Sequence, residues 1–126
     1  IKKNPSFRPL INRKNEYLEE ANFEELIPIL LGARLVVSVD TAAMHLAVAA
    51  GTQTLCLASA AYVGEIIPYA AEITPDNVTF IYTPMECQGC LGRCTLSTER
   101  GMFPCVRRIL QSDVLSKVQK LLDVNI

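Results

Sequence analysis

The sequence lacks an excess of charge of either sign and lacks any long apolar run, and both absences exclude classes of function. Its 126 residues carry 12 Lys and Arg against 13 Asp and Glu, and the formal net charge is -1. This balance argues against a basic surface for nucleic acid, and aromatic and basic residues do not interleave as they do in single-strand binders. No apolar run approaches the roughly 20 residues of a membrane helix, and the N-terminus has no signal-peptide core. We therefore predict a cytoplasmic protein that does not bind nucleic acid.

The length and apolar content of the chain fit a single domain with one hydrophobic core, or a part of such a domain. The sequence begins at Ile1, and we expect the natural protein to begin upstream. Residues 1–21 are polar and change from basic to acidic along the chain. This pattern favours a solvated N-terminal segment that is the remnant of a truncated domain. We expect the folded α/β portion to occupy residues 22–126.

Apolar spacing predicts alternating helices and strands. The expected elements are a helix at 23–31, a strand at 35–39, a helix at 41–50, strands at 53–58 and 78–82, and a helix at 113–123. Asn22 and Ser112 are the expected N-caps of the first and last helices, and Pro28 predicts a kink or a late start. The strand at 35–39 shows no polar alternation, as is typical of a strand covered on both faces. Strand, helix and strand in this order predict a parallel sheet.

Polar and small residues stand where the first strand passes into a helix. Asp40 and Thr41 follow the strand, and Ala42 and Ala43 open the helix. Ligands bind beyond the carboxyl ends of parallel strands, and the free N–H groups of a helix N-terminus attract an anion such as phosphate. Thr41 adds a hydroxyl, Asp40 can cap the helix or orient a donor, and His45 can donate to a phosphate or sugar oxygen. We predict a ligand that carries phosphate; the alternative is a plain helix cap and a packed histidine.

The segment at 60–70 follows the second strand and would lie at the same edge of the sheet. In one interpretation its polar and aromatic residues line a sugar pocket; in the other the segment packs on its own core through Ile66 and Ile67. The candidate lining residues are Tyr62, Gly64, Glu65 and Tyr69.

Four of the five cysteines gather in the loop at 86–106, and Cys56 in the second strand is expected to be a small core residue. The spacing C-x2-C-x3-C-x10-C suits a structural, tetrahedral zinc site, and the alternative is four reduced thiols in a surface loop. No base lies near them in sequence, so we expect no catalytic role. The four are Cys87, Cys90, Cys94 and Cys105.

The segment ARLVVSVDTAAMHLAVAAGTQTLCL resembles the signature of glycosyltransferase family nine, the ADP-heptose:lipopolysaccharide heptosyltransferases. That signature runs from a strand through Asp-Thr/Ser-Gly-x-x-His to Gly-Thr-Pro and a second strand. The preceding NFEELIPILLGA and the later CVRRI with its helix are also similar to the family, so the resemblance spans roughly residues 15–123. The family's glycine is Ala42 here, and its proline is Gln53.

The resemblance implies a Rossmann-like, α/β donor-binding portion of the C-terminal domain in the two-domain GT-B arrangement. The acceptor site and the catalytic carboxylate would then lie on an N-terminal domain outside this chain, so the chain would hold no catalytic residue and be inactive alone. The implied reaction is a metal-independent transfer, with no cofactor, from an ADP-sugar to a lipopolysaccharide-type or other surface-glycan acceptor. We expect the protein in the cytoplasm, peripheral to the inner face of the cytoplasmic membrane.

The resemblance also implies which residues contact the donor. The diphosphate and sugar would be bound by side chains of the strand end and by backbone N–H groups of the following helix. These residues are Asp40, Thr41, Ala42, Ala43, Met44 and His45. The alternative function is a non-catalytic binding or interaction module with the same fold, stabilised by a bound metal ion.

Overall fold

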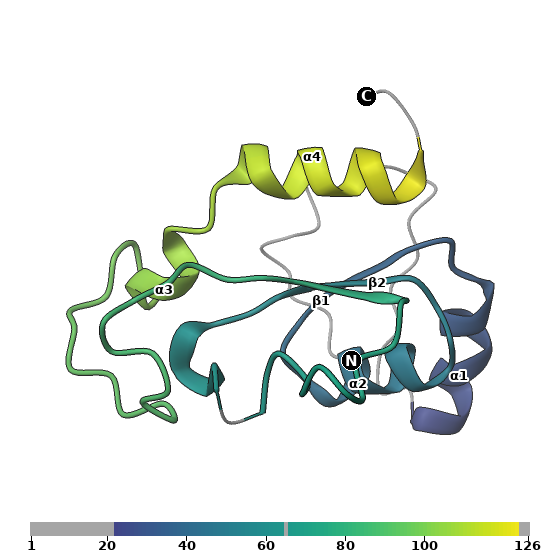
Figure 1. Cartoon of the computed structure of the whole chain (residues 1–126), viewed down its shortest axis with the longest axis horizontal. Helices are drawn as coiled ribbons and strands as arrows, with labels where there is room; N and C mark the ends of the chain where they lie inside the picture. The colour runs from purple at the N-terminus through teal and green to yellow at the C-terminus, as the bar shows by residue number, and fades with distance from the viewer. Residues whose placement is uncertain (1–21, 65, 124–126) are drawn as a thin grey trace.

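The computed structural model describes residues 22–64 and 66–123, which form a three-stranded parallel sheet with helices on both faces (Figure 1). The strand order is β1-β2-β3, with both neighbouring pairs parallel, as the sequence predicts. The α/β, Rossmann-like fold is therefore confirmed. In chain order the elements are α1 (Phe23–Gly32), β1 (Val36–Val39), α2 (Ala42–Ala49), β2 (Thr54–Leu57), η2 (Ala60–Tyr62), β3 (Val78–Ile81), α3 (Pro104–Arg107) and α4 (Gln111–Leu122). The polar N-terminal segment expected at 1–21 lies outside the described residues.

Helix α1 begins where the sequence predicts. The Asn22 side chain accepts a hydrogen bond from the Glu25 backbone N–H at 2.9 Å, which satisfies one free donor of the first turn. Pro28 lies inside the helix without delaying its start, so of the two expected effects, a kink or a late start, the late start does not occur. Leu26 and Leu30 are buried against Ala47 of α2, and this contact fixes α1 beside α2.

The β1-α2-β2 unit forms the centre of the structure. Gly51 ends α2 with φ +84, a left-handed conformation that glycine adopts without strain. The chain then returns so that Val36 pairs with Thr54 in parallel register. Met44 and Val48 of α2 are buried in a cluster with Cys56 of β2, so helix and sheet share one apolar core.

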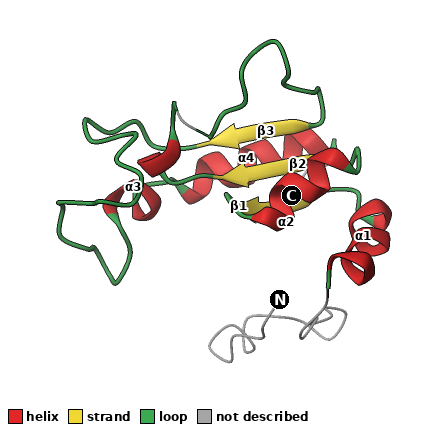
Figure 2. Ribbon diagram, turned by 90° about the horizontal axis from the view of Figure 1, so that it is seen from below, coloured by secondary structure: helices red, strands yellow, loops and turns green. Residues whose placement is uncertain are grey.

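Among the strands that the structure describes, only the central strand β2 is buried on both faces. Val37 and Val39 of β1 are 48% and 49% exposed, so the expectation of a strand covered on both sides is wrong for β1. The reason is the layering: α1 and α2 lie on one side of the sheet and α4 on the other (Figures 1 and 2), yet α4 buries none of its described residues. The N-cap of α4 is Leu110, which corrects the expected cap at Ser112.

None of the helices that the structure describes has the length and apolar character that a bilayer crossing requires.

Candidate functional site

The N-terminus of α2 lies open at the carboxyl end of β1. Thr41 and Ala42 are exposed, while Asp40, Ala43 and His45 are half-buried. In the part of the chain that the structure describes, the backbone N–H groups of Ala42 and Ala43 have no hydrogen-bond acceptor. Free N–H groups at a helix N-terminus carry partial positive charge, so this turn can hold an anion.

The side chain of Thr41 leaves these N–H groups free, although Thr41 is the N-cap residue. Its hydroxyl lies 3.5 Å from the Val39 carbonyl oxygen and 3.4 Å from the Ser38 hydroxyl, and it makes no capping bond. The first turn of α2 also has no acidic residue, whereas α1 has Asn22 as cap and two glutamates in its first turn. The first turn of α2 therefore carries no negative charge of its own against the helix dipole, although the carboxylate of Asp40 stands one residue before the N-cap.

Met44 does not contribute to this site in the way the resemblance implies. Its side chain is 0% exposed in the core, and its backbone N–H already donates to the Thr41 carbonyl at 3.1 Å. The donors left for an anion are those of the two alanines before it, because the first turn of α2 closes on Thr41.

Asp40 is held in place by the neighbouring strand rather than by the helix. The Ser59 hydroxyl donates to Asp40 Oδ2 at 3.2 Å. Asp40 and Ser59 follow β1 and β2, whose carboxyl ends meet at one edge because the strands are parallel. Ser59 was not among the predicted site residues, although its place directly after a predicted strand was a usable signal. The carboxylate of Asp40 keeps free lone pairs for a ligand hydroxyl.

His45 meets Tyr69 across the same edge. The Tyr69 hydroxyl lies 2.7 Å from His45 Nδ1, and the two rings are 5.6 Å apart at 34°. Tyr69 was one of the residues expected near a sugar, and the structure brings it to the predicted histidine. Burial raises the pKa of Tyr69, so the phenol keeps its proton at neutral pH.

The other residues expected in the 60–70 segment divide between core and surface. Ile67 is 1% exposed and part of the core, while Ile66 is 53% exposed. Gly64 is exposed, and Glu65 lies outside the described residues. Tyr62 turns to the cysteine-rich loop rather than to Asp40. The segment therefore packs on the core through Ile67 but not through Ile66, and the interpretation that its other residues line a sugar pocket stays a prediction.

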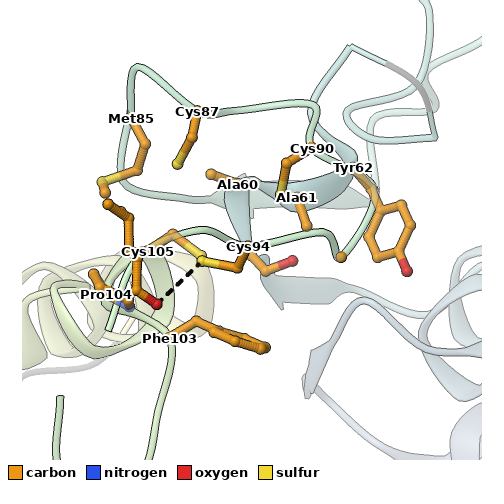
Figure 3. A pocket seen from close by; sticks show the side chains of 13 residues that line it. Ala60, Ala61, Tyr62, Met85, Cys87, Cys90, Cys94, Phe103, Pro104 and Cys105 are labelled. Carbon is orange, nitrogen blue, oxygen red and sulfur yellow. Dashed lines mark hydrogen bonds between the residues drawn. The ribbon is translucent and has the colours of Figure 1, made fainter. Parts of the chain in front are cut away.

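The four cysteines of the loop line one apolar pocket of about 150 Å³ (Figure 3). The pocket lies between the segment after β3 and α3, with Met85 and Cys87 on one side and Phe103 and Pro104 on the other. All five cysteines of the chain are free thiols. Within residues 22–64 and 66–123, no three His, Cys, Asp or Glu side chains are grouped so that they could hold a metal ion. A zinc ion here stays a prediction.

The cysteine-rich loop is attached to the sheet edge by backbone hydrogen bonds. The N–H groups of Gly89 and Leu91 donate to the carbonyls of Ala60 and Ala61, each at 2.8 Å. Ser59 lines the pocket and also donates to Asp40, so the pocket adjoins the open end of α2. The structure thus places the thiols beside the candidate ligand site.

One of three comparisons with known proteins found a match. A family model described as glycosyltransferase family 9 (heptosyltransferase) matches residues 12–95, which include the whole β1-α2-β2 unit. Comparisons with curated proteins and with solved structures gave no match. The matched range contains the open N-terminus of α2 and most of the pocket. The chain belongs to glycosyltransferase family 9, a heptosyltransferase family of enzymes that transfer a sugar from a nucleotide-sugar donor to a glycan acceptor.

Proposed function

We propose that Asp40, Thr41, Ala42, Ala43 and His45 bind the diphosphate and sugar of an ADP-sugar, heptose-like in its sugar, for transfer to a lipopolysaccharide-type acceptor. The single observation that carries the proposal is the open N-terminus of α2. Two N–H groups without acceptors lie there beside a carboxylate and an imidazole, at the carboxyl end of a parallel sheet.

The charges in the site suggest a division of roles. The N–H groups of Ala42 and Ala43 suit a phosphate oxygen, because they are donors at the positive end of the helix dipole. The carboxylate of Asp40 would repel a phosphate, so it suits a sugar hydroxyl that donates to it. Thr41 stands between Asp40 and the two alanines, His45 follows them in the first turn of α2, and both side chains offer further donors.

In the transfer reaction an acceptor hydroxyl attacks the anomeric carbon, and the bond from that carbon to the diphosphate oxygen breaks. The negative charge that develops on the leaving diphosphate would fall next to α2, whose N–H groups are already oriented. The proton of the acceptor hydroxyl would pass to a carboxylate on a domain outside this chain, as the family resemblance implies. A lipid-linked acceptor would place the reaction at the inner face of the cytoplasmic membrane.

The test is a calorimetric titration with ADP, with an ADP-heptose and with a UDP-sugar. We expect Asp40→Asn to weaken ADP-heptose about tenfold or more without weakening ADP, because the carboxylate is assigned to the sugar and repels phosphate. His45→Ala should weaken ADP-heptose. Asp113→Asn, an exposed aspartate in the first turn of α4, is the control and should change nothing.

Equal affinities of the wild-type protein and both site variants would overturn the proposal. Tighter binding of the UDP-sugar would overturn the assignment of adenine as the base. If no sugar nucleotide binds, the non-catalytic binding module becomes the better description of the chain.

The zinc prediction has its own measurement. Zinc in stoichiometric amount in protein purified without chelator, and its loss in Cys90→Ala, would support a metal at the four thiols. Metal-free protein in which all four thiols react with an alkylating reagent would support the alternative of reduced thiols.

A further inference from the structure

The contact between Tyr69 and His45 joins two segments that are 24 residues apart in the chain. His45 lies in the first turn of α2, and Tyr69 lies between η2 and β3. The oxygen to Nδ1 distance of 2.7 Å is that of a strong hydrogen bond. The bond leaves one ring nitrogen, Nε2, for another partner.

Two contacts, one of its ring and one of its backbone, hold Tyr69 in place. Its ring packs edge-on against Phe80 of β3, with centroids 5.3 Å apart at 83°. Its backbone carbonyl accepts a hydrogen bond from the Thr74 hydroxyl at 3.1 Å. The phenol is therefore oriented by the sheet and by its own loop before any ligand arrives.

The direction of the hydrogen bond follows from the two acceptors that the hydroxyl can reach. His45 Nδ1 lies at 2.7 Å and the thioether sulfur of Met44 at 3.8 Å. An imidazole nitrogen is a far better acceptor than a thioether, so the phenol donates to Nδ1 when the imidazole is neutral. The ring proton of His45 then resides on Nε2. Among the described residues Nε2 has no hydrogen-bond partner.

We propose that Tyr69 is a positioning residue, which holds His45 with its proton on Nε2 so that this N–H donates to an oxygen of the bound sugar nucleotide. The proposal rests on the proposed function of residues 40–45. The imidazole otherwise exchanges its proton between two nitrogens and turns about its side-chain bonds. Tyr69 removes both freedoms, so less conformational entropy is lost when the donor binds.

The first experiment needs no ligand. His45 is the only histidine in this sequence, so selective 15N-histidine labelling reports on it, and His45→Gln identifies its signals by their loss. At alkaline pH, where an imidazole is neutral, we expect long-range 1H–15N spectra to show a single tautomer with the proton on Nε2. In Tyr69→Phe the two 15N shifts should move towards those of free imidazole. Tyr82→Phe, a tyrosine against the same core cluster, is the control and should leave the spectrum unchanged.

The second experiment asks whether the bond serves binding. Tyr69→Phe keeps the ring on Phe80 and removes only the hydroxyl, so the fold should persist. We expect it to weaken ADP-heptose about five- to tenfold in the wild-type background and to have no further effect in His45→Ala. A loss of equal size in both backgrounds would show a purely structural role and overturn the proposal.

Two other results would also overturn it. An unchanged histidine spectrum in Tyr69→Phe would mean that the hydroxyl does not set the tautomer. Tighter donor binding by Tyr69→Phe would mean that the phenol competes with the ligand for the imidazole. If the wild-type protein binds no sugar nucleotide, the proposed function fails, while the ligand-free spectrum still decides whether Tyr69 holds His45.

Discussion

Cys56 shows at the scale of one residue how the sheet changes side-chain chemistry. It is 0% exposed in the centre of β2. Burial and the nearby carboxylate of Asp40 raise the pKa of its thiol from 9.0 to about 12, because both disfavour the thiolate. The same carboxylate thus serves the candidate site and keeps a core thiol neutral.

The reactivity of Cys56 follows from that shift. A rise from 9.0 to about 12 lowers its thiolate fraction at pH 8 about a thousandfold, so iodoacetamide should modify Cys56 last in the native protein. Cys94 is half-exposed and should react early. Mass spectrometry of tryptic peptides after timed labelling checks the order, with urea-unfolded protein as the control. Equal rates for Cys56 and Cys94 in the native protein would contradict it.

The same shift gives the direction of a pH effect on stability. Folding raises this pKa, so burial of the neutral thiol contributes stability below pH 9.0, and the contribution is lost as the pH rises through about 12. Tyr69, whose pKa is also raised by burial, acts in the same direction above its usual value of 10.0.

At the scale of elements, the first and last helices differ in whether the predicted N-cap residue caps the helix. Asn22 accepts the Glu25 N–H and caps α1, whereas Ser112 lies inside α4, after the N-cap at Leu110. Both residues fit the sequence rule for helix starts. The two helices differ in which residue comes directly before the first helical residue. The sequence pattern locates that boundary only to within a few residues.

Alanine substitutions at these two positions should therefore differ. Asn22→Ala should lower the free energy of unfolding by about 1 kcal/mol, because a first-turn N–H of α1 loses its acceptor. Ser112→Ala should change it by less than about 0.5 kcal/mol, as expected at an exposed position without a capping bond. Urea denaturation of both variants measures the difference. A larger loss at Ser112 than at Asn22 would contradict the cap assignment.

At the scale of the whole molecule, a buried and a half-buried polar residue join the helices of one layer to the sheet. Thr52 is 7% exposed, and its hydroxyl donates to the Leu30 carbonyl of α1 at 2.8 Å. The Asn77 amide before β3 donates to the carbonyls of Val48 at 3.1 Å and Thr52 at 2.8 Å. These bonds tie both helices of one layer to the amino ends of β2 and β3, opposite the candidate site.

Asn77 should therefore matter more to stability than its place in a turn suggests. Asn77→Asp removes both donated hydrogen bonds and sets a carboxylate against two carbonyl oxygens, so we expect a loss of about 2 kcal/mol or more. Asp76→Asn, at the exposed neighbouring position, is the matched control and should cost almost nothing. Thermal and urea unfolding measure both variants, and equal stability of the two would contradict this role for Asn77.

Much of the fold was predictable because it rests on local signals. The apolar β-branched run of β1, the glycine at 51 and the second apolar run predict a parallel unit, and the structure contains it. The exposure of Val37 and Val39 was not predictable. It depends on how closely α4 approaches the sheet, and no local pattern in β1 records that distance.

The sequence by itself determined the order of the elements and the place where a helix follows a strand, because helix and strand periods are properties of adjacent residues. Only the structure showed that no side chain caps this helix. Only the tertiary structure decided that Asp40 meets Ser59, that His45 meets Tyr69 and that the four thiols of the loop face one pocket. Those pairs are 19 and 24 residues apart, and their contact depends on the path of the chain across the sheet edge.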